Sequence, residues 1–259
     1  MDTKFVGGWD LNVNIGYNEH NHINCADCRT ALRFVLGDSI DLIVTSPPYK
    51  EEDGYSKGLI RKVAWESYRI LKPDNLCFVN FGHFAGHKKQ PFEVAETFEG
   101  VGFEWVDTII WIKNHFSPIQ GSKRLNNLFE YVFLFAKGKD YKLDRLSIGV
   151  PYQDKSNIGR YSDVDLRCGG NIWYIDYETI TNKGQKKHPH RFPVELPSRC
   201  IKLAGLESGS VVLDPFMGGG TTAVAAQRLG MGYLGFEKNP KFVKDAIKWL
   251  EEEKEDEVN

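Results

Sequence analysis

The sequence predicts an α/β fold in which a mostly parallel sheet carries helices on both faces. Two observations indicate this class: short apolar runs alternate with amphipathic stretches along the chain, and no internal repeat or low-complexity linker interrupts that alternation. A third is the length of 259 residues, which suits one large domain with at most a small appendage.

Each expected strand is a short run rich in aliphatic and aromatic residues. In chain order the expected strands are Asp41–Thr45, Leu76–Asn80, Thr108–Ile112, Tyr131–Phe135, Ser210–Leu213 and Tyr233–Phe236. The expected helices span residues 59–72, 90–99, 192–205, 220–230 and 239–253.

Two helix ends carry clear local signals. Helix 59–72 is expected to end at Lys72, because the following proline disfavours a helical backbone in the residue before it. Helix 239–253 is expected to begin after Asn239, which can cap it and is followed by a proline at the first helical position.

Composition predicts a reduced, cytoplasmic protein without a membrane span. The N-terminal residues lack the basic and apolar regions of a secretory signal, and no apolar run reaches the roughly 18 residues that a membrane helix needs. Five cysteines in a chain of this length do not make a disulfide framework. Cys25-x-x-Cys28 has no second cysteine pair at matching spacing, so we expect no metal site.

The charge is unevenly distributed. The net charge is −2, but residues 251–259 hold six acidic residues and one lysine, so the rest of the chain is net positive. Basic residues gather in 113–145 and again in 183–191. Such clusters are either solvated surface or sites for phosphate groups, and composition alone leaves both readings open.

A glycine-rich turn follows the expected strand Ser210–Leu213. The pattern Gly218-x-Gly220-x-x-Ala223 is typical of turns that let a backbone approach a nucleotide-like ligand. Glu237 stands 17 residues beyond Gly220, where it can accept hydrogen bonds from ribose hydroxyls. The pattern admits NAD. However, Asp214 just before the turn is a poor neighbour for a pyrophosphate and a good one for a sulfonium, which favours S-adenosylmethionine.

A second unusual loop, Ser46-Pro47-Pro48-Tyr49, ends the expected strand Asp41–Thr45. Two prolines stiffen this loop and leave carbonyl groups free to accept hydrogen bonds. A serine oxygen and a proline carbonyl could together accept the hydrogens of an exocyclic amino group, and Tyr49 could stack on its ring. The loop therefore suits chemistry on a nucleobase amine.

The two loops together resemble the β group of amino-methyltransferases, which modify N4 of cytosine or N6 of adenine in DNA. In that family a [DNS]PP[YFW] motif precedes an FxGxG cofactor motif, as Thr45–Tyr49 precedes Asp214–Thr222 here. Further similarity lies in Asn24–Asp27, in Trp111–Phe135 and in the HPHRFP segment at 188–193, so the resemblance covers most of the chain.

The resemblance implies a permuted Rossmann-like, S-adenosylmethionine-dependent fold with a seven-stranded sheet. It divides the chain into a catalytic half (1–139), a small target-recognition region (140–187) and a cofactor-binding half (188–259) of one domain. The residues implied to be catalytic are Ser46, Pro47, Pro48 and Tyr49. The residues implied to contact the cofactor are Asp27, Thr45, Phe192, Pro193, Asp214, Phe216, Gly218, Gly220, Thr221, Thr222 and Glu237. The basic residues expected to contact double-stranded DNA are Lys113, Lys123, Arg124, Lys186 and Lys187.

Serine at the first motif position favours N4 of cytosine over N6 of adenine within the family. C5-cytosine methylation is excluded because none of the five cysteines follows a proline. A glutamine methyltransferase acting on protein would carry asparagine in this loop and the cofactor motif first. An NAD oxidoreductase and a non-catalytic DNA-binding module are the remaining alternatives. The family also implies restriction-modification, with or without a cognate endonuclease, in a monomer or homodimer.

Overall fold

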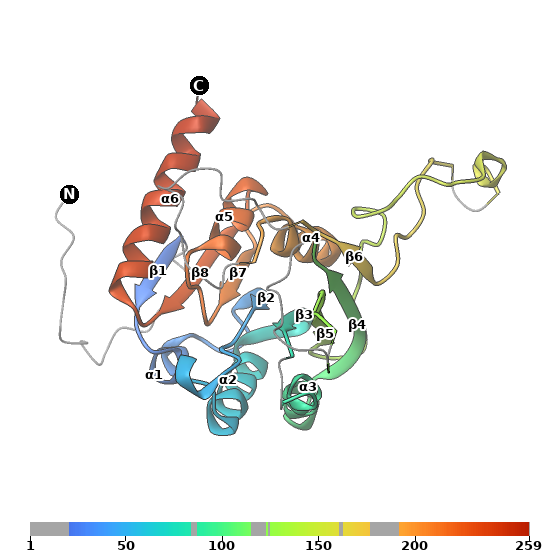
Figure 1. The fold of residues 1–259 in the computed structure, drawn as a ribbon. Coiled ribbons are helices and arrows are strands. Elements are labelled where there is room, and N and C mark those ends of the chain that lie inside the picture. The colour runs from blue at the N-terminus through green and yellow to red at the C-terminus, as the bar shows by residue number, and fades with distance from the viewer. Residues whose placement is uncertain are drawn as a thin grey trace.

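The computed structural model describes residues 21–83, 87–114, 123, 125–160, 163–176 and 192–258. Figure 1 shows a central sheet with α1, α2 and α3 beneath it and α4, α5 and α6 above it. The strands are β1 (His22–Cys25), β2 (Ile40–Thr45), β3 (Leu71–Phe81), β4 (Glu104–Ile112), β5 (Phe129–Ala136), β6 (Ile172–Tyr174), β7 (Val211–Asp214) and β8 (Gly232–Glu237). The helices are α1 (Cys28–Ala31), α2 (Lys57–Ile70), α3 (Gln90–Gly100), α4 (Glu195–Ala204), α5 (Thr221–Arg228) and α6 (Pro240–Val258).

The sheet confirms the mostly parallel α/β class. Its strand order is β1-β8-β7-β2-β3-β5-β4-β6, and β5 alone among the described strands runs antiparallel to its neighbours. The described strands number eight, whereas the apolar runs predicted six and the resemblance implied seven. The two strands that the apolar runs did not predict are β1 and β6, and β6 lies in region 140–187, where the sequence analysis placed no strand or helix.

The expected boundary at Lys72 was wrong. Helix α2 already ends at Ile70, and β3 begins at Leu71, which pairs with Ile40. The ladder between β2 and β3 then shifts register and resumes at Leu76, so the proline lies in the irregular part of the strand, where no ladder bond is required. The cap at Asn239 is confirmed, because its Oδ1 accepts from the Lys241 amide at 3.0 Å.

Two apolar layers flank the sheet. On one face α2 and α3 bury Ile60, Val63 and Phe98 against inward side chains of the strands. On the other face α4, α5 and α6 bury the second layer, which includes Trp249. Burial of both faces explains why the central strands read as nearly continuous apolar runs.

The connections diverge between β2 and β7, which pair in parallel. From β2 the chain passes through α2 to β3 on one side, and from β7 it passes through α5 to β8 on the other. Ligands of open α/β sheets bind outside the carboxyl ends of the strands at such a switch point. In the part of the chain that the structure describes, no helix combines the length and apolarity that a bilayer crossing needs.

Candidate active site

A cavity of about 830 Å³ lies at the carboxyl ends of β2 and β7. The two loops predicted from sequence line it together, Ser46–Tyr49 from β2 and Asp214–Gly219 from β7. Further lining residues come from α1, β3, β4, β5, β8 and α6, whose ends meet at the same edge of the sheet. The sequence-distant motifs therefore form one site.

Asp214 links the end of β2 to the glycine-rich turn through buried hydrogen bonds. It is 1% exposed, and its Oδ1 accepts from Thr45 Oγ1 at 2.7 Å and from the Phe216 amide at 2.9 Å. Its Oδ2 accepts from Thr222 Oγ1 at 2.8 Å. Burial raises the pKa of Asp214 to about 6, while these hydrogen bonds act in the opposite direction. The carboxyl group thus ties the strand end of β2 to both sides of the glycine turn.

The glycine turn has the backbone that its sequence predicted. Gly218 and Gly220 both have positive φ, 52° and 87°. A Cβ at Gly220 would lie 2.7 Å from that of Ala246 in α6, so the turn also needs glycine for close packing. The Met217 amide donates to the Phe236 carbonyl at 3.0 Å, which holds the turn against β8.

Two carboxylates stand around the cofactor-type turn. Glu237, at the end of β8, accepts from the Gly218 amide at 3.0 Å and from the Asn239 amide at 2.7 Å. Asp27 caps α1 and pairs with Arg29 at 2.5 Å, and hydrogen bonding to Arg29 lowers the pKa of Asp27. Both side chains line the cavity and offer acceptor oxygens to hydroxyl or amino groups of a ligand.

Thr221 supplies a second indication that a polar ligand belongs here. Its side chain lines the cavity and is 3% exposed, and its Oγ1 has no hydrogen-bond partner among the described residues. Buried hydroxyl groups are normally satisfied, so an unpartnered one in a cavity wall indicates a ligand that completes its bonding. Together with acidic residues and a close-approach glycine turn, these residues fit S-adenosylmethionine.

Hydrogen bonds within the loop Ser46–Tyr49, called the catalytic-type loop below, and from this loop to β3, β5 and α3 hold it in place. Ser46 Oγ lies 3.1 Å from Tyr49 Oη and donates to Asn80 Oδ1 at 3.3 Å. Tyr49 Oη is also within hydrogen-bond distance of Asn80 Oδ1, at 3.0 Å, and of Glu130 Oε2, at 2.9 Å. The Gln90 side chain donates to the Tyr49 carbonyl at 2.9 Å. Both side chains that the sequence singled out are therefore held in one orientation.

Glycine at position 82 allows the Tyr49 ring to pack closely. The ring lies 4.5 Å from that of Phe81, and a Cβ at Gly82 would come within 2.8 Å of Tyr49 Cε2 and 3.1 Å of the Glu130 carboxyl group. Any larger side chain there would have to displace the Tyr49 ring or the Glu130 carboxyl group.

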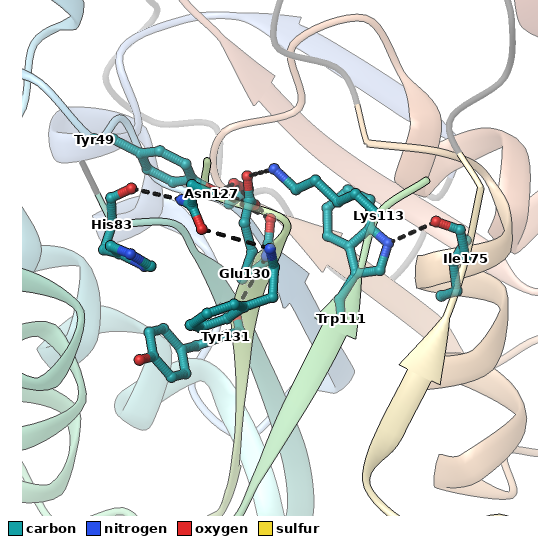
Figure 2. A network of polar contacts seen from close by, with 11 residues as sticks. Tyr49, His83, Trp111, Lys113, Asn127, Glu130, Tyr131 and Ile175 are labelled. Carbon is teal, nitrogen blue, oxygen red and sulfur yellow. Dashed lines mark hydrogen bonds and ion pairs between the residues drawn. The ribbon is translucent and has the colours of Figure 1, made fainter. Parts of the chain in front are cut away.

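Glu130 and Lys113 form a buried ion pair at the base of the cavity. Figure 2 shows Glu130, at the start of β5, with Tyr49 on one side and Lys113 on the other. The side chains are 10% and 13% exposed, and Lys113 Nζ pairs with Glu130 Oε1. Sequence reasoning missed Glu130 and Asn80, because each lies at the end of an apolar run and belongs to neither of the two motifs. Lys113 was singled out for its charge alone.

Most of the predicted site residues lie around the cavity. Those that line it are Asp27, Ser46, Pro47, Pro48, Tyr49, Lys113, Phe192, Asp214, Phe216, Gly218, Thr221 and Glu237. Thr45, Pro193 and Thr222 are buried outside the cavity lining, and Gly220 is the N-cap residue of α5. Lys123 is exposed. Three predicted DNA contacts, Arg124, Lys186 and Lys187, lie outside the described residues.

The described residues contain no group of three or more histidine, cysteine or acidic side chains placed to hold a metal ion. Cys28 is buried, which raises the pKa of its thiol to about 12. His83, beside the Ser46–Glu130 network, has a pKa lowered by burial.

Fold and site together define the class of protein. It is an α/β enzyme in which a cofactor turn and the catalytic-type loop meet at the switch point between β2 and β7. The model of the DNA methylase family, N6_N4_Mtase, matches residues 40–248. The orphan methyltransferase M.BamHII of Bacillus amyloliquefaciens is 32% identical over 234 residues, which cover 80% of this chain and 87% of that protein. The type II methyltransferase M.BglII of Bacillus subtilis is 26% identical over 259 residues, covering 92% and 71%. The chain therefore belongs to the DNA methylase family of N6 and N4 methyltransferases.

Solved structures agree with this assignment. TTHA0409 of Thermus thermophilus, solved in complex with S-adenosyl-L-methionine, is 25% identical with a TM-score of 0.63, and the match covers 88% of this chain and 93% of that one. The cytosine-N4-specific PvuII DNA methyltransferase shares the fold, with a TM-score of 0.70 at 23% identity over 88% and 86% of the two chains.

Proposed function

We propose that the protein transfers a methyl group from S-adenosylmethionine to N4 of a cytosine extruded from duplex DNA. The observation that carries this proposal is the shared cavity in which Ser46 and Tyr49 face the glycine turn at Gly218. A cofactor held on the turn and a base held on the loop would meet there.

The cofactor, when bound, supplies an electrophilic methyl group on a sulfonium. Glu237 and Asp27 would hydrogen-bond the polar groups of the cofactor. The Thr221 hydroxyl group would form a hydrogen bond to the same ligand. Gly218 lines the cavity with a positive φ, so glycine there leaves room for the cofactor to approach the backbone.

On the opposite side, Ser46 Oγ and the Pro47 carbonyl would accept the two hydrogens of the target amine. Hydrogen bonds from the amine to these two oxygen atoms would oppose the delocalisation of the nitrogen lone pair into the ring. The nitrogen would then be a better nucleophile. Positioning the amine against the methyl group contributes the rest, since proximity and orientation can supply about 7–11 kcal/mol of a barrier. The Tyr49 ring would stack on the base, at about 1–3 kcal/mol.

A base in duplex DNA cannot reach this cavity unless it leaves the helix, which costs a few kcal/mol. We propose that segment 140–187 reads the surrounding sequence. In support, Figure 1 shows its described part leaving the sheet as a long arm before it returns at β6. The arm is braced by the Val150–Arg167 bridge and by Lys155 paired with Asp165 at 2.5 Å. The basic residues that would contact DNA phosphates are Lys123, Arg124, Lys186 and Lys187. A cognate restriction endonuclease would recognise the same DNA sequence.

The choice of N4 of cytosine rests on serine at the first position of the loop. Nucleoside mass spectrometry tests it: unmethylated phage DNA is incubated with the protein and deuterated-methyl S-adenosylmethionine, then digested. We expect labelled N4-methylcytosine. Labelled N6-methyladenine would keep the family chemistry and refute the target base, whereas unlabelled DNA would refute the function.

A further inference from the structure

We infer that Glu130 is the acceptor for the proton that the target amine loses, reached through the hydroxyl groups of Ser46 and Tyr49. This inference rests on the proposed methyl transfer and assigns a role to a residue outside the two sequence motifs. Glu130 acts through Tyr49, so it is a positioning and proton-accepting residue behind the reacting atoms.

The geometry forms a continuous chain. Ser46 Oγ lies 3.1 Å from Tyr49 Oη, which lies 2.9 Å from Glu130 Oε2. Both distances are in the range of hydrogen bonds between oxygen atoms, or close to it. Tyr49 has one proton to donate, and an ionised carboxylate is a stronger acceptor than an amide, so that proton points towards Glu130.

Asn80 aligns the chain but cannot end it. Its Nδ2 donates to the Tyr131 carbonyl at 3.1 Å, so its Oδ1 must face Ser46 and Tyr49. Ser46 can donate its one proton either to Asn80 Oδ1 at 3.3 Å or to Tyr49 Oη at 3.1 Å, and the proton transfer uses the second arrangement. The amide oxygen accepts a hydrogen bond but is too weak a base to take up the proton itself. A carboxylate is therefore needed further along, and Glu130 supplies it.

Lys113 prepares Glu130 for this role. Its ammonium group pairs with Oε1, while Oε2 is left towards Tyr49. A buried carboxylate is costly unless it is paired, so the ion pair explains how a charged acceptor is maintained at this buried position in the cavity wall.

The step balances. As the bond between nitrogen and the methyl carbon forms, the bond between carbon and sulfur breaks, and the sulfonium becomes a neutral thioether. The nitrogen passes one proton to Ser46 Oγ, the Ser46 proton moves to Tyr49 Oη, and the Tyr49 proton moves to Glu130 Oε2. A positive sulfonium and a negative carboxylate are thereby both neutralised, so the net charge of the cavity does not change. The carboxylic acid later returns its proton to solvent.

The test compares single-turnover methylation of DNA by wild type, Glu130→Gln, Tyr49→Phe and the double variant, at saturating S-adenosylmethionine and DNA. Glu130→Gln should slow transfer about 100-fold, since a positioned proton acceptor contributes about 10²–10⁴-fold. In the Tyr49→Phe background, where the chain is already broken, the same change should alter the rate less than about threefold, because residues that act as a unit are not additive.

A purely structural role for Glu130 would give a different pattern. Glu130→Gln would then slow the Tyr49→Phe variant as much as it slows wild type, and that result would overturn the inference. A second readout is the dependence on added buffer base. The methylation rate of Glu130→Gln should rise with buffer concentration at constant pH, while the wild-type rate should not. A Glu130→Gln rate that does not change with buffer concentration would also overturn the inference. A wild-type protein that methylates no DNA would refute the proposed function instead.

Discussion

Gly82 is the residue on which the placement of the Tyr49 ring depends most directly. A methyl group at this position would lie 2.8 Å from Tyr49 Cε2 and 3.1 Å from the Glu130 carboxyl group. We predict that Gly82→Ala lowers the rate constant of methyl transfer by about 10- to 100-fold, because small misplacements of catalytic groups cost rate steeply. The measurement is single-turnover methylation of DNA.

Gly58→Ala is the matched control for that prediction. Gly58 lies exposed in α2, and a Cβ there meets nothing within 4 Å. The change should leave the rate intact and raise stability by roughly 0.5–1 kcal/mol, because alanine is the better helix residue. If Gly82→Ala kept the rate of the Gly58→Ala control, the packing argument for Tyr49 would be wrong.

Asp214 makes the stability of the protein depend on pH. Its folded pKa of about 6 is above the ordinary value of 3.8, since burial disfavours the charged form. As pH rises from about 4 to about 6, the unfolded state loses this proton before the folded state does, so the free energy of unfolding falls. The loss is up to about 3 kcal/mol and is complete above that window.

The comparison that isolates this effect is wild type against Asp214→Asn in urea unfolding at pH 4 and pH 7. The variant lacks the titrating group, so the difference between wild-type and variant stability should decrease towards pH 7. A difference that stays constant or increases with pH would show that Asp214 does not titrate in this way.

At the scale of elements, the contact between the glycine turn and α6 fixes the start of α5. Gly220→Ala would combine a positive φ of 87° with a Cβ 2.7 Å from that of Ala246. Gly209→Ala has a similar φ of 85° and meets nothing within 4 Å, so it isolates the backbone strain. We predict that Gly220→Ala loses about 1–3 kcal/mol more stability than Gly209→Ala, from overpacking. Equal losses in urea unfolding without cofactor would show that α6 yields to the extra methyl group.

The elements that the sequence predicted are those with a strong local signal. Asp41–Thr45 and Ser210–Leu213 read as strands because both faces of the sheet are buried there, and the loops after them carry proline and glycine. By contrast, β1 has four residues, none of them buried, and β6 has three residues, of which only Trp173 is buried. Both exist because a neighbouring strand pairs with them, which no local pattern reports.

The site divides in the same way. Ser46 and Gly218 lie in motifs, so a resemblance reveals them. Glu130 and Asn80 become polar partners of the site only when β3 and β5 pair and bring them beside Tyr49. Lys113 illustrates the limit of charge counting, because the sequence cannot distinguish a solvated lysine from one that is 13% exposed in an ion pair.

At the scale of the whole molecule, the order of the motifs along the chain does not matter for the site. The catalytic-type loop comes first and the cofactor turn comes much later, yet β2 and β7 are neighbours in the sheet and Thr45 reaches Asp214 at 2.7 Å across a separation of 169 residues. The proposed methyl transfer requires that the catalytic-type loop and the cofactor turn bind different ligands while they share one cavity.

That requirement is tested most directly by Ser46→Ala, with Ser208→Ala, which lies outside the cavity lining, as the control. Methyl transfer to DNA and cofactor affinity are measured on the same samples. Because Ser46 would contact the target base and not the cofactor, we predict that Ser46→Ala lowers the transfer rate about 100-fold. The Kd for S-adenosylmethionine should change by less than about twofold. A Ser46→Ala protein that methylates DNA at the rate of the Ser208→Ala control would contradict the account.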